Sequence, residues 1–241
     1  MQIIPVHFEK EISPSDDLSD ILLKFDNLND GDIIVIAQKV ISKQEKRLVS
    51  LSSVVPSLLA QGIASQYKKD PRIVELILSE SKKIVRMSRG ILIVETHHGF
   101  ICANAGIDES NVEEGFVTLL PVDSDKSAQL IRKKIFERSG KNIAIIISDT
   151  FGRSFRLGQT NHAIGVSGLN PILDYEGTLD SFNKILRVTA IAVADELASS
   201  SELVMGKSLK CPFAIIRDYS FEFEECSIDK LIRPENEDLF R

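Results

Sequence analysis

An aspartate ends an apolar run near the middle of the chain. Residues 143–149 read IAIIISD, and Asp149 is followed at once by Thr150. A carboxylate beside a hydroxyl near the end of a buried strand forms an oxygen-rich corner, which suits a hard cation such as Mg²⁺ or Mn²⁺. In open α/β sheets, ligands bind outside such strand ends. This segment is therefore a candidate metal and ligand site.

The segment that follows carries groups that bind anions. Residues 151–168 read FGRSFRLGQTNHAIGVSG and contain Arg153 and Arg156 but no acidic side chain. Guanidinium groups pair with phosphate or carboxylate, and glycines let backbone amides approach an anion closely. The two features together favour a phosphorylated ligand bound with a metal ion. A strand end capped by an aspartate and followed by a glycine-rich turn explains the same residues, and stays open.

A second aspartate stands in a similar setting. The stretch GFICANAGIDESNV, residues 99–112, runs from an apolar segment to Asp108 and Asn111. If the two apolar strands are neighbours, Asp108 and Asp149 can hold one ion between them, as phosphoryl-transfer sites do. The alternative for Asp108 is an Asx-turn in a surface loop.

A third stretch, GDIIVIAQKVISKQEKR at residues 31–47, leads from a strand into basic residues. Ser42 and Lys43 are candidate phosphate contacts, with a solvated, charged turn as the alternative. The sequence GxxxxGK[ST] does not occur, which excludes a P-loop. Residues 206–208, Gly-Lys-Ser, resemble its end, but they follow a predicted helix and read as its C-terminal cap.

Two further features lie near these stretches. His162 falls within the glycine-rich segment and is a candidate ligand contact. The adjacent acids Asp195 and Glu196 lie in a predicted helix, where they form either an acid pair near the site or its solvated edge.

Composition narrows the class of protein. The chain has 241 residues, 43% of them hydrophobic, and a formal net charge of −6. No basic block suggests nucleic-acid binding, and the apolar runs are too short to cross a bilayer. Cys102, Cys211 and Cys226 share no CxxC spacing, which favours a reducing compartment. We expect a cytoplasmic protein without a nucleic-acid or membrane partner.

The elements that must position these residues form a mixed α/β chain. β-Branched runs bounded by turn residues predict strands at 32–37, 90–95, 99–103, 116–122, 142–148 and 212–219. Apolar periodicity and capping residues predict helices at 16–24, 70–88, 125–140 and 179–206. Because strands and helices do not alternate strictly, a simple doubly wound sheet does not follow. We expect one compact α+β unit, with two lobes as an alternative.

The same stretches resemble a known family. Together with LLPVDSDKSA and VADELASSSELVMGK, they stand in an order and spacing similar to the coenzyme F420-0:L-glutamate ligase family, up to about residue 218. The resemblance implies that L-glutamate is joined to the carboxylate of the deazaflavin coenzyme F420-0 at the expense of GTP, through an acyl phosphate. Later glutamates are γ-linked. The implied fold is a two-lobed, intertwined homodimer, with residues 1–218 as the ligase domain and 219–241 as a C-terminal tail.

The resemblance also implies roles for individual residues. Asp108 and Asp149 correspond to ligands of one divalent ion and Thr150 to a ligand of a second, with K⁺ as an additional ion. The residues expected along GTP are Glu9, Lys10, Glu11, Ile12, Gln38, Lys39, Lys43, Asn111, Met205, Gly206, Lys207 and Ser208. The residues expected to contact phosphate or the substrate carboxylate during catalysis are Arg153, Arg156 and Gln159.

Some positions depart from the family pattern. Ser154 and Phe155 stand where Pro-Trp is expected, and Asn161 stands where an aspartate is expected. Lys207 cannot ligate a metal while protonated. These departures leave open a nucleotide-binding regulatory domain of the same fold without turnover. A ligase for another carboxylate acceptor also stays open, because the sequence does not show the acceptor pocket.

Overall fold

A five-stranded sheet forms the centre of the molecule. In a computed structural model, which describes residues 1–25 and 28–238, its strands are ordered β1 (Gln2–Val6), β12 (Phe213–Arg217), β2 (Ile33–Ala37), β8 (Ala144–Gly152) and β9 (Gln159–Ser167). β2 and β8 are parallel, and the other neighbouring strands are antiparallel. The parallel pair makes the carboxyl ends of β2 and β8 meet at one edge of the sheet.

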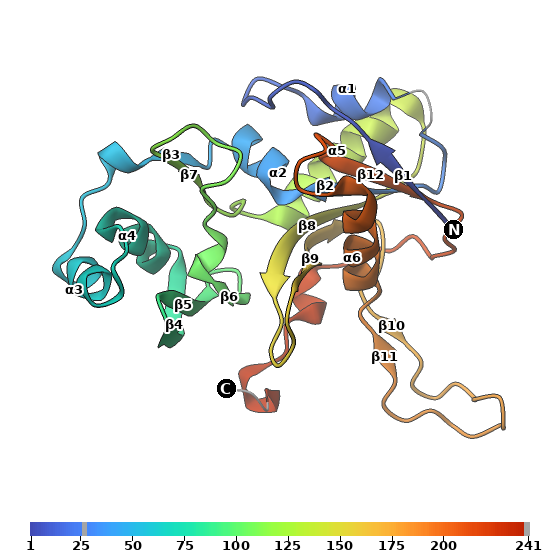
Figure 1. Cartoon of the computed structure of the whole chain (residues 1–241). Coiled ribbons are helices and arrows are strands. Elements are labelled where there is room, and N and C mark those ends of the chain that lie inside the picture. Colours follow the sequence, from blue (N-terminus) through green and yellow to red (C-terminus); the bar gives the residue numbers. More distant parts are fainter. Residues whose placement is uncertain (26–27, 239–241) are drawn as a thin grey trace.

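The two central strands are buried on both faces. Side chains alternate across a strand, so Ile34 and Ile145 enter one apolar cluster while Ile33 and Ile146 enter another. The first cluster lies under α1 (Leu18–Leu23) and α5 (Ser124–Ser139), and the second lies under α6 (Val193–Met205). The sheet is thus a middle layer between helices (Figure 1).

Smaller sheets lie to one side of this layer (Figure 1). An antiparallel sheet of β4 (Ser81–Ser88), β5 (Ile91–Thr96) and β6 (Ile101–Ala103) packs against α3 (Leu58–Tyr67) and α4 (Pro71–Ser79) around an apolar cluster of its own. A separate ladder joins β3 (Leu48–Ser50) to β7 (Phe116–Thr118). Short 3₁₀ turns complete the list: η1 (Leu51–Ser53), η2 (Asn104–Gly106), η3 (Ile228–Leu231) and η4 (Glu235–Glu237). The mixed α/β class is confirmed.

The strand predictions each find a strand, and two helix predictions are confirmed. α1 falls within 16–24 and is capped by Asp17, whose side chain accepts from the Ser19 backbone N–H. α5 is capped by Asp123 and ends at Gly140, which adopts the left-handed conformation with φ of 71°.

The helix predicted over 70–88 is half wrong. α4 begins at Pro71 after the Asp70 cap and ends at Ser79, and Ser81–Ser88 form β4 instead. Pairing with β5 decides the second half: Ile84, which is β-branched, lies opposite Val94 of that strand. Tertiary pairing here overrides an apolar spacing that also fits a helix.

The helix predicted over 179–206 is wrong before residue 193. Residues 173–191 form a hairpin arm whose strands are β10 (Leu173–Asp174) and β11 (Ala190–Ile191). Backbone bonds such as Tyr175 N–H to Thr189 O, 2.8 Å, continue the pairing along the arm. The arm extends away from the rest of the molecule (Figure 1). Its apolar side chains are exposed in this chain, so their spacing does not mark a helix face packed on the core.

Asp149 lies near the end of β8, as predicted, but the glycine-rich turn predicted after it is mostly a strand. β8 continues through Asp149 to Gly152, and most of the following segment is its hairpin partner β9. Gly165 serves packing rather than anion binding, because a Cβ there would lie 2.4 Å from the Cβ of Ser124 at the start of α5. Its lack of a side chain lets the helix approach the strand.

Two helices were not predicted. α2 (Gln38–Gln44) begins directly after β2 where a charged turn was the alternative, and α3 lies in a stretch left unassigned. Within the described residues, no helix is both long enough and apolar enough to cross a membrane.

Candidate functional site

The carboxyl edge of the β2–β8 pair gathers the predicted residues. Ala37 of β2 pairs with Ser148 of β8, so the residues that follow each of them leave the buried sheet side by side. Gln38 and Lys39 start α2 on one side, and Asp149 and Thr150 continue β8 on the other. This is where ligands bind beside parallel strands.

Two lysines of α2 reach the loop that contains Asp108. Lys39 and Lys43 are four residues apart and therefore lie on one face of the helix. Lys39 Nζ lies 2.8 Å from Asp108 Oδ2 and 2.9 Å from the carbonyl oxygen of Ser110. Lys43 Nζ lies 2.5 Å from Glu11 Oε2 and 3.2 Å from the carbonyl oxygen of Asn111. The helix thus joins the N-terminal segment to the 108–111 loop.

Asp108 is held in its ionised form. Burial opposes its ionisation, but the hydrogen bonds from Lys39 and Ser110 outweigh burial and hold the pKa of this carboxyl below its usual range. The Ser110 backbone N–H donates to Asp108 Oδ1 at 2.7 Å, which is the Asx-turn considered as an alternative. The loop therefore presents a fixed negative charge beside a fixed positive one.

Asp149 has the opposite tendency. It is mostly surrounded by protein, although water still reaches it, and burial raises the pKa of its carboxyl to about 6. The Asp108 carboxylate adds to the rise, while the backbone N–H of Thr150 and the ammonium groups of Lys207 and Lys39 oppose it. The two aspartates from distant segments are therefore close enough to repel each other.

Thr150 belongs to a polar network on the other side of β8. Its hydroxyl donates to Asn161 Oδ1 at 2.6 Å and accepts from Lys207 Nζ at 2.5 Å. Asn161 in turn donates to Glu202 Oε2 at 3.0 Å, and Glu202 pairs with Lys207 at 3.0 Å. Asn161 is buried and faces Thr150 across the β8–β9 ladder. An ammonium group therefore occupies the position beside Thr150.

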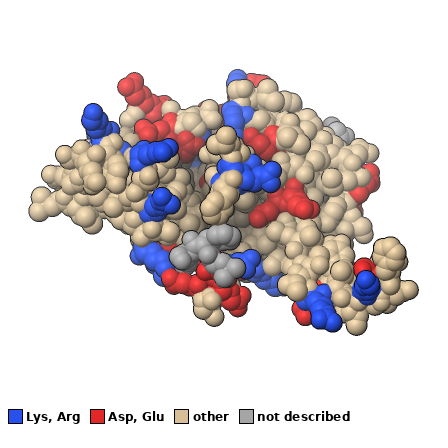
Figure 2. Space-filling view, turned by 60° about the horizontal axis from the view of Figure 1, so that its bottom comes forward, with Lys and Arg blue, Asp and Glu red and all other residues tan. Residues whose placement is uncertain are grey.

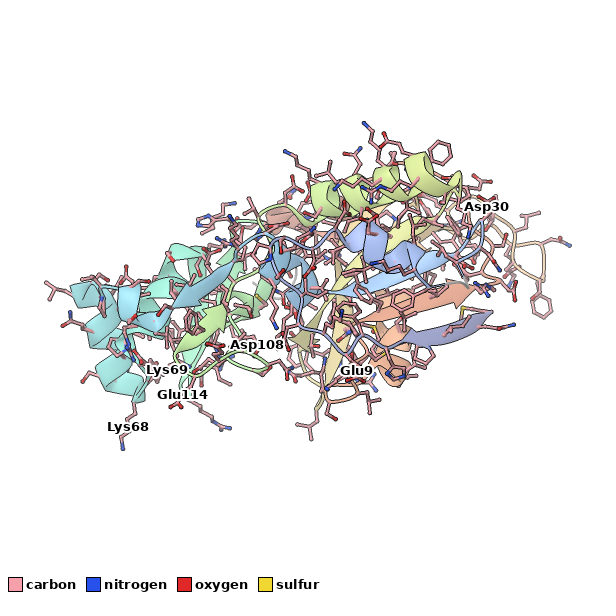
Figure 3. All side chains as sticks on the ribbon, turned by 90° about the horizontal axis from the view of Figure 1, so that it is seen from above. Glu9, Asp30, Lys68, Lys69, Asp108 and Glu114 are labelled. Atoms are coloured by element: carbon pink, nitrogen blue, oxygen red, sulfur yellow. The ribbon has the colours of Figure 1, made fainter. Side chains whose placement is uncertain are left out.

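The N-terminal segment and the loop after α6 close the rim of this site. Lys210 Nζ lies 2.7 Å from Glu9 Oε2, and the Phe8 backbone N–H donates to the carbonyl oxygen of Lys210 at 2.9 Å. Glu9 and Asp108 lie toward the same side of the molecule in Figure 3, while Asp30 lies at the far end of the sheet. Of the other residues predicted on these two segments, Lys10, Lys207 and Ser208 are exposed, Gly206 is half-buried, and Ile12 and Met205 are buried.

Gln38 lies beneath the surface of this site. Its side chain is buried and donates to Ser42 Oγ at 2.6 Å and to the carbonyl oxygen of Leu119 at 3.1 Å. Ser42 also donates to Leu119, at 2.6 Å. In this structure both residues tie α2 to the chain after β7.

Of the three residues predicted as catalytic, Arg153 and Arg156 lie on the turn between β8 and β9, and Gln159 is the first residue of β9. Arg153 donates to the carbonyl oxygen of Leu157 within that turn, at 2.9 Å. The side chains of Arg156 and Gln159 are exposed. The structure does not bring these three side chains into contact with Asp108 or Asp149, and their catalytic role stays a prediction.

A histidine paired with an aspartate lies opposite Asp149. His162 faces Asp149 across the β8–β9 ladder, its Nδ1 lies 3.5 Å from Asp195 Oδ2, and its Nε2 lies 3.1 Å from Thr160 Oγ1. Asp195 also accepts from the Ala163 backbone N–H at 2.8 Å, which fixes the carboxylate. His162 and Asp195 were noticed separately in the sequence, and only the packing of α6 on β9 pairs them.

The charges of the site are balanced in pairs. Lys39, Lys43, Lys207 and Lys210 each contact a carboxylate. Basic and acidic side chains are likewise interspersed over the face drawn in Figure 2. The described residues contain no group of three or more His, Cys, Asp or Glu side chains placed to hold a metal ion. A cation here would take two carboxylates and complete its shell with other oxygens.

Comparison with known proteins gives consistent matches. The sequence model of the family described as F420-0:Gamma-glutamyl ligase matches residues 9–218. The chain is 47% identical to the coenzyme F420:L-glutamate ligase of Methanothermobacter thermautotrophicus, covering 90% of this chain and 87% of the relative. It is 44% identical to the ligase of that name from Methanocaldococcus jannaschii, covering 93% and 90%. For Methanopyrus kandleri the identity is 40%, covering 100% and 98%.

Proposed function

The chain belongs to the F420-0:gamma-glutamyl ligase family, and on this basis we propose that it joins L-glutamate to coenzyme F420-0, with GTP as the phosphoryl donor. The observation that carries the proposal is the approach of Asp108 and Asp149 beside Lys39 at the carboxyl edge of β2 and β8. Such an arrangement suits the transfer of a phosphoryl group.

The reaction proceeds in two steps. A carboxylate oxygen of F420-0 attacks the γ-phosphorus of GTP, which forms an acyl phosphate and releases GDP. The amine of glutamate then attacks the acyl carbon, the C–N bond forms, the C–O bond to phosphate breaks, and inorganic phosphate leaves. Later glutamates are added through γ-carboxylates. No protein nucleophile is required, so the side chains act by positioning reactants and neutralising charge.

Asp108 and Asp149 fit one divalent ion. The Asp108 carboxylate disfavours ionisation of Asp149, and a cation bound between them would remove this repulsion. An all-oxygen donor set is what Mg²⁺ and Mn²⁺ prefer. When bound, the ion would neutralise charge on the transferring phosphoryl group.

The surroundings of Thr150 fit a second divalent ion less well. The Lys207 ammonium lies 2.5 Å from the Thr150 hydroxyl, and Asn161 supplies a neutral amide where a carboxylate would favour a cation. The second ion and K⁺ stay predictions from the resemblance, and no step here depends on them. Lys207 is itself a cation and would pair with a phosphate oxygen.

The four lysines of the site bind the polyphosphate of GTP by exchanging partners. Each lysine forms an ion pair with one carboxylate: the pairs are Lys39–Asp108, Lys43–Glu11, Lys207–Glu202 and Lys210–Glu9. A triphosphate presents several charged oxygens at once and competes well for such exposed ion pairs.

His162 accepts the proton released by the attacking amine. It is held by Asp195 and Thr160 and faces Asp149 across the ladder, so it lies beside the position where the acyl phosphate forms. A histidine oriented by a carboxylate is a common general base near neutral pH.

We also propose that the protein works as a homodimer. The arm at residues 173–191 exposes large apolar side chains: Leu179 by 60%, Phe182 by 82%, Ile185 by 63% and Val188 by 90%. Clusters of exposed apolar residues on soluble proteins mark interaction sites. A second copy of the chain would cover them.

The direct experiment supplies F420-0, L-glutamate, GTP and either Mg²⁺ or Mn²⁺. The proposal requires a product heavier by one glutamate residue, with one GDP released for each product formed. GTP bound tightly without ligation would favour a regulatory domain, and ligation only with another acceptor would favour a ligase of different specificity. Either result would contradict the proposal.

A further inference from the structure

One cavity of the described chain lies away from the nucleotide and metal candidates. It has a volume of about 760 Å³ and is bounded by the turn at His97 and His98, the start of α5, the edge strand β9 and the C-terminal segment at 225–229. It shares no lining residue with the set expected to bind GTP or metal. Cavities of this size hold small organic molecules.

The walls of the cavity combine apolar surfaces with occupied charges. Phe100, Ile164, Val166 and Ile228 supply the apolar part. Three of the acids on its rim already have partners: Asp123 caps α5, Asp125 accepts from the backbone N–H groups of Val166 and Ile228 at 2.7 and 3.0 Å, and Glu225 pairs with Arg132. The apolar side chains therefore offer a surface for a ring, beside charged side chains that include Lys126 and Asp229.

A row of rings leads from this cavity to Asp149. His98 stacks on Phe100 with 5.8 Å between ring centroids, Phe100 lies 6.1 Å from Phe151, and Phe151 stacks on His162 at 5.6 Å. His98 and Phe100 line the cavity, whereas His162 faces Asp149. All four residues are partly exposed. The row forms a path between the two sites.

We propose that this cavity binds the planar heteroaromatic ring system of the acceptor. The acceptor's side chain then runs along Phe100 and Phe151 and delivers its carboxylate to the phosphoryl donor at Asp149. This inference rests on the proposed function, because it assigns a place to the acceptor of that reaction. Flat aromatic surfaces favour such a ligand through offset stacking.

The C-terminal segment forms one wall of the cavity and lies beyond the family match, which ends at residue 218. It spans from the five-stranded sheet to the smaller one: Ser167 of β9 donates to Glu225, and Lys83 of β4 pairs with Glu235. The C-terminal segment therefore shapes the cavity with residues that the family match does not cover.

Binding measurements without glutamate test the inference. The probes are F420-0 and its deazaflavin chromophore lacking the phosphate-containing side chain, and Kd is measured for each by fluorescence titration. Gln129→Trp fills the cavity from an exposed position on α5. Leu130→Trp places the same ring on the adjacent exposed residue, outside the cavity, and is the matched control. Phe100→Leu removes a ring from the row without adding volume.

We expect Gln129→Trp to raise Kd for both probes by about tenfold or more, a loss of the size of one aromatic contact. Phe100→Leu raises both Kd values as well, while Leu130→Trp leaves them unchanged. Kd for GTP stays the same in all three variants. Unchanged binding of the chromophore by folded Gln129→Trp and Phe100→Leu would overturn the inference.

Parallel ligation assays separate this inference from the proposed function. Wild-type protein that adds glutamate, together with Gln129→Trp that binds both probes normally, refutes the acceptor cavity alone. Wild-type protein that binds GTP but adds no glutamate refutes the proposed function and removes the reason to expect this acceptor.

Discussion

The ammonium of Lys39 lies 2.8 Å from the carboxylate of Asp108, across the gap between α2 and the loop before β7. The pair links α2, which carries Lys39 and Lys43, to one of the two predicted metal ligands. Asp108 is therefore ionised and can bind a cation. The ammonium group of Lys39 can form an ion pair with a phosphate group bound beside it.

Replacing Lys39 with methionine weakens GTP binding. The change removes one charge-assisted hydrogen bond to phosphate, so Kd for GTP rises by about tenfold or more. Calorimetric titration with GTP and Mg²⁺ measures it. Lys133→Met is the control, because Lys133 is exposed on α5 and makes only a 3.9 Å pair with Glu137. Equal GTP affinity in the two variants would show that Lys39 does not contact GTP.

Replacing Asp149 with asparagine nearly abolishes ligation. The change removes one of the two charges that would hold a divalent ion against the phosphoryl group. Initial rates at saturating GTP and limiting Mn²⁺ measure the loss, with Glu137→Gln as a control on an exposed face of α5. Wild-type rates in Asp149→Asn would show that this residue does not ligate the divalent ion.

The same variant is also informative without metal, through the pH dependence of stability. Because the pKa of Asp149 is raised to about 6, its ionisation destabilises the fold relative to the unfolded chain, where the group titrates near 4. The destabilisation is absent below about pH 4, grows between the two values and is complete above about pH 6. Asp149→Asn therefore gains stability over wild type at pH 8 but not at pH 4, as urea unfolding would show; an equal difference at both values contradicts the assignment.

Much of the fold follows from the sequence because local signals agree with the final contacts. Capping by Asp17 and Asp123, and the β-branched runs of β2 and β8, predict their elements directly. The helix predictions for residues 81–88 and 179–192 are wrong because apolar spacing alone does not show whether the side chains face a core, another strand or solvent. Only the pairing with β5 and the exposure of the arm decide these cases.

The site was predicted in part for the same reason. Lys39 and Lys43 follow β2, Asp108 follows β6, and Asp149 lies near the carboxyl end of β8. The structure brings these segments together. The pairing of His162 with Asp195 depends on how α6 packs on edge strand β9, which no local pattern encodes. Gln38 looked like a ligand contact, yet its burial follows from the start of α2 immediately after β2.

Replacing His162 with asparagine slows the amine step. We expect kcat to fall by about 100-fold or more, the usual range for loss of a general base, while Kd for GTP is unchanged. Stopped-flow assays measure the rate and equilibrium titration measures the GTP affinity. A parallel loss of GTP affinity would show that His162 has a structural role instead.

Polar substitutions on the arm dissociate the dimer. Phe182→Ser with Val188→Ser removes two side chains that are 82% and 90% exposed in the single chain, and apolar burial is the expected driving force of the interface. Sedimentation equilibrium should show a dimer for wild type and a monomer for the double variant. Val55→Ser, at a residue 86% exposed elsewhere, is the control. A wild-type monomer would refute the proposal.

The measurement that tests the account most directly follows the oxygen of the acceptor. F420-0 labelled with ¹⁸O in its reactive carboxylate is incubated with the protein, GTP, L-glutamate and Mg²⁺, and the phosphate released is analysed by mass spectrometry. Attack of that carboxylate on GTP predicts one ¹⁸O atom in each inorganic phosphate, in step with the amide formed. Product accompanied by unlabelled phosphate, or phosphate released without product, would contradict the account.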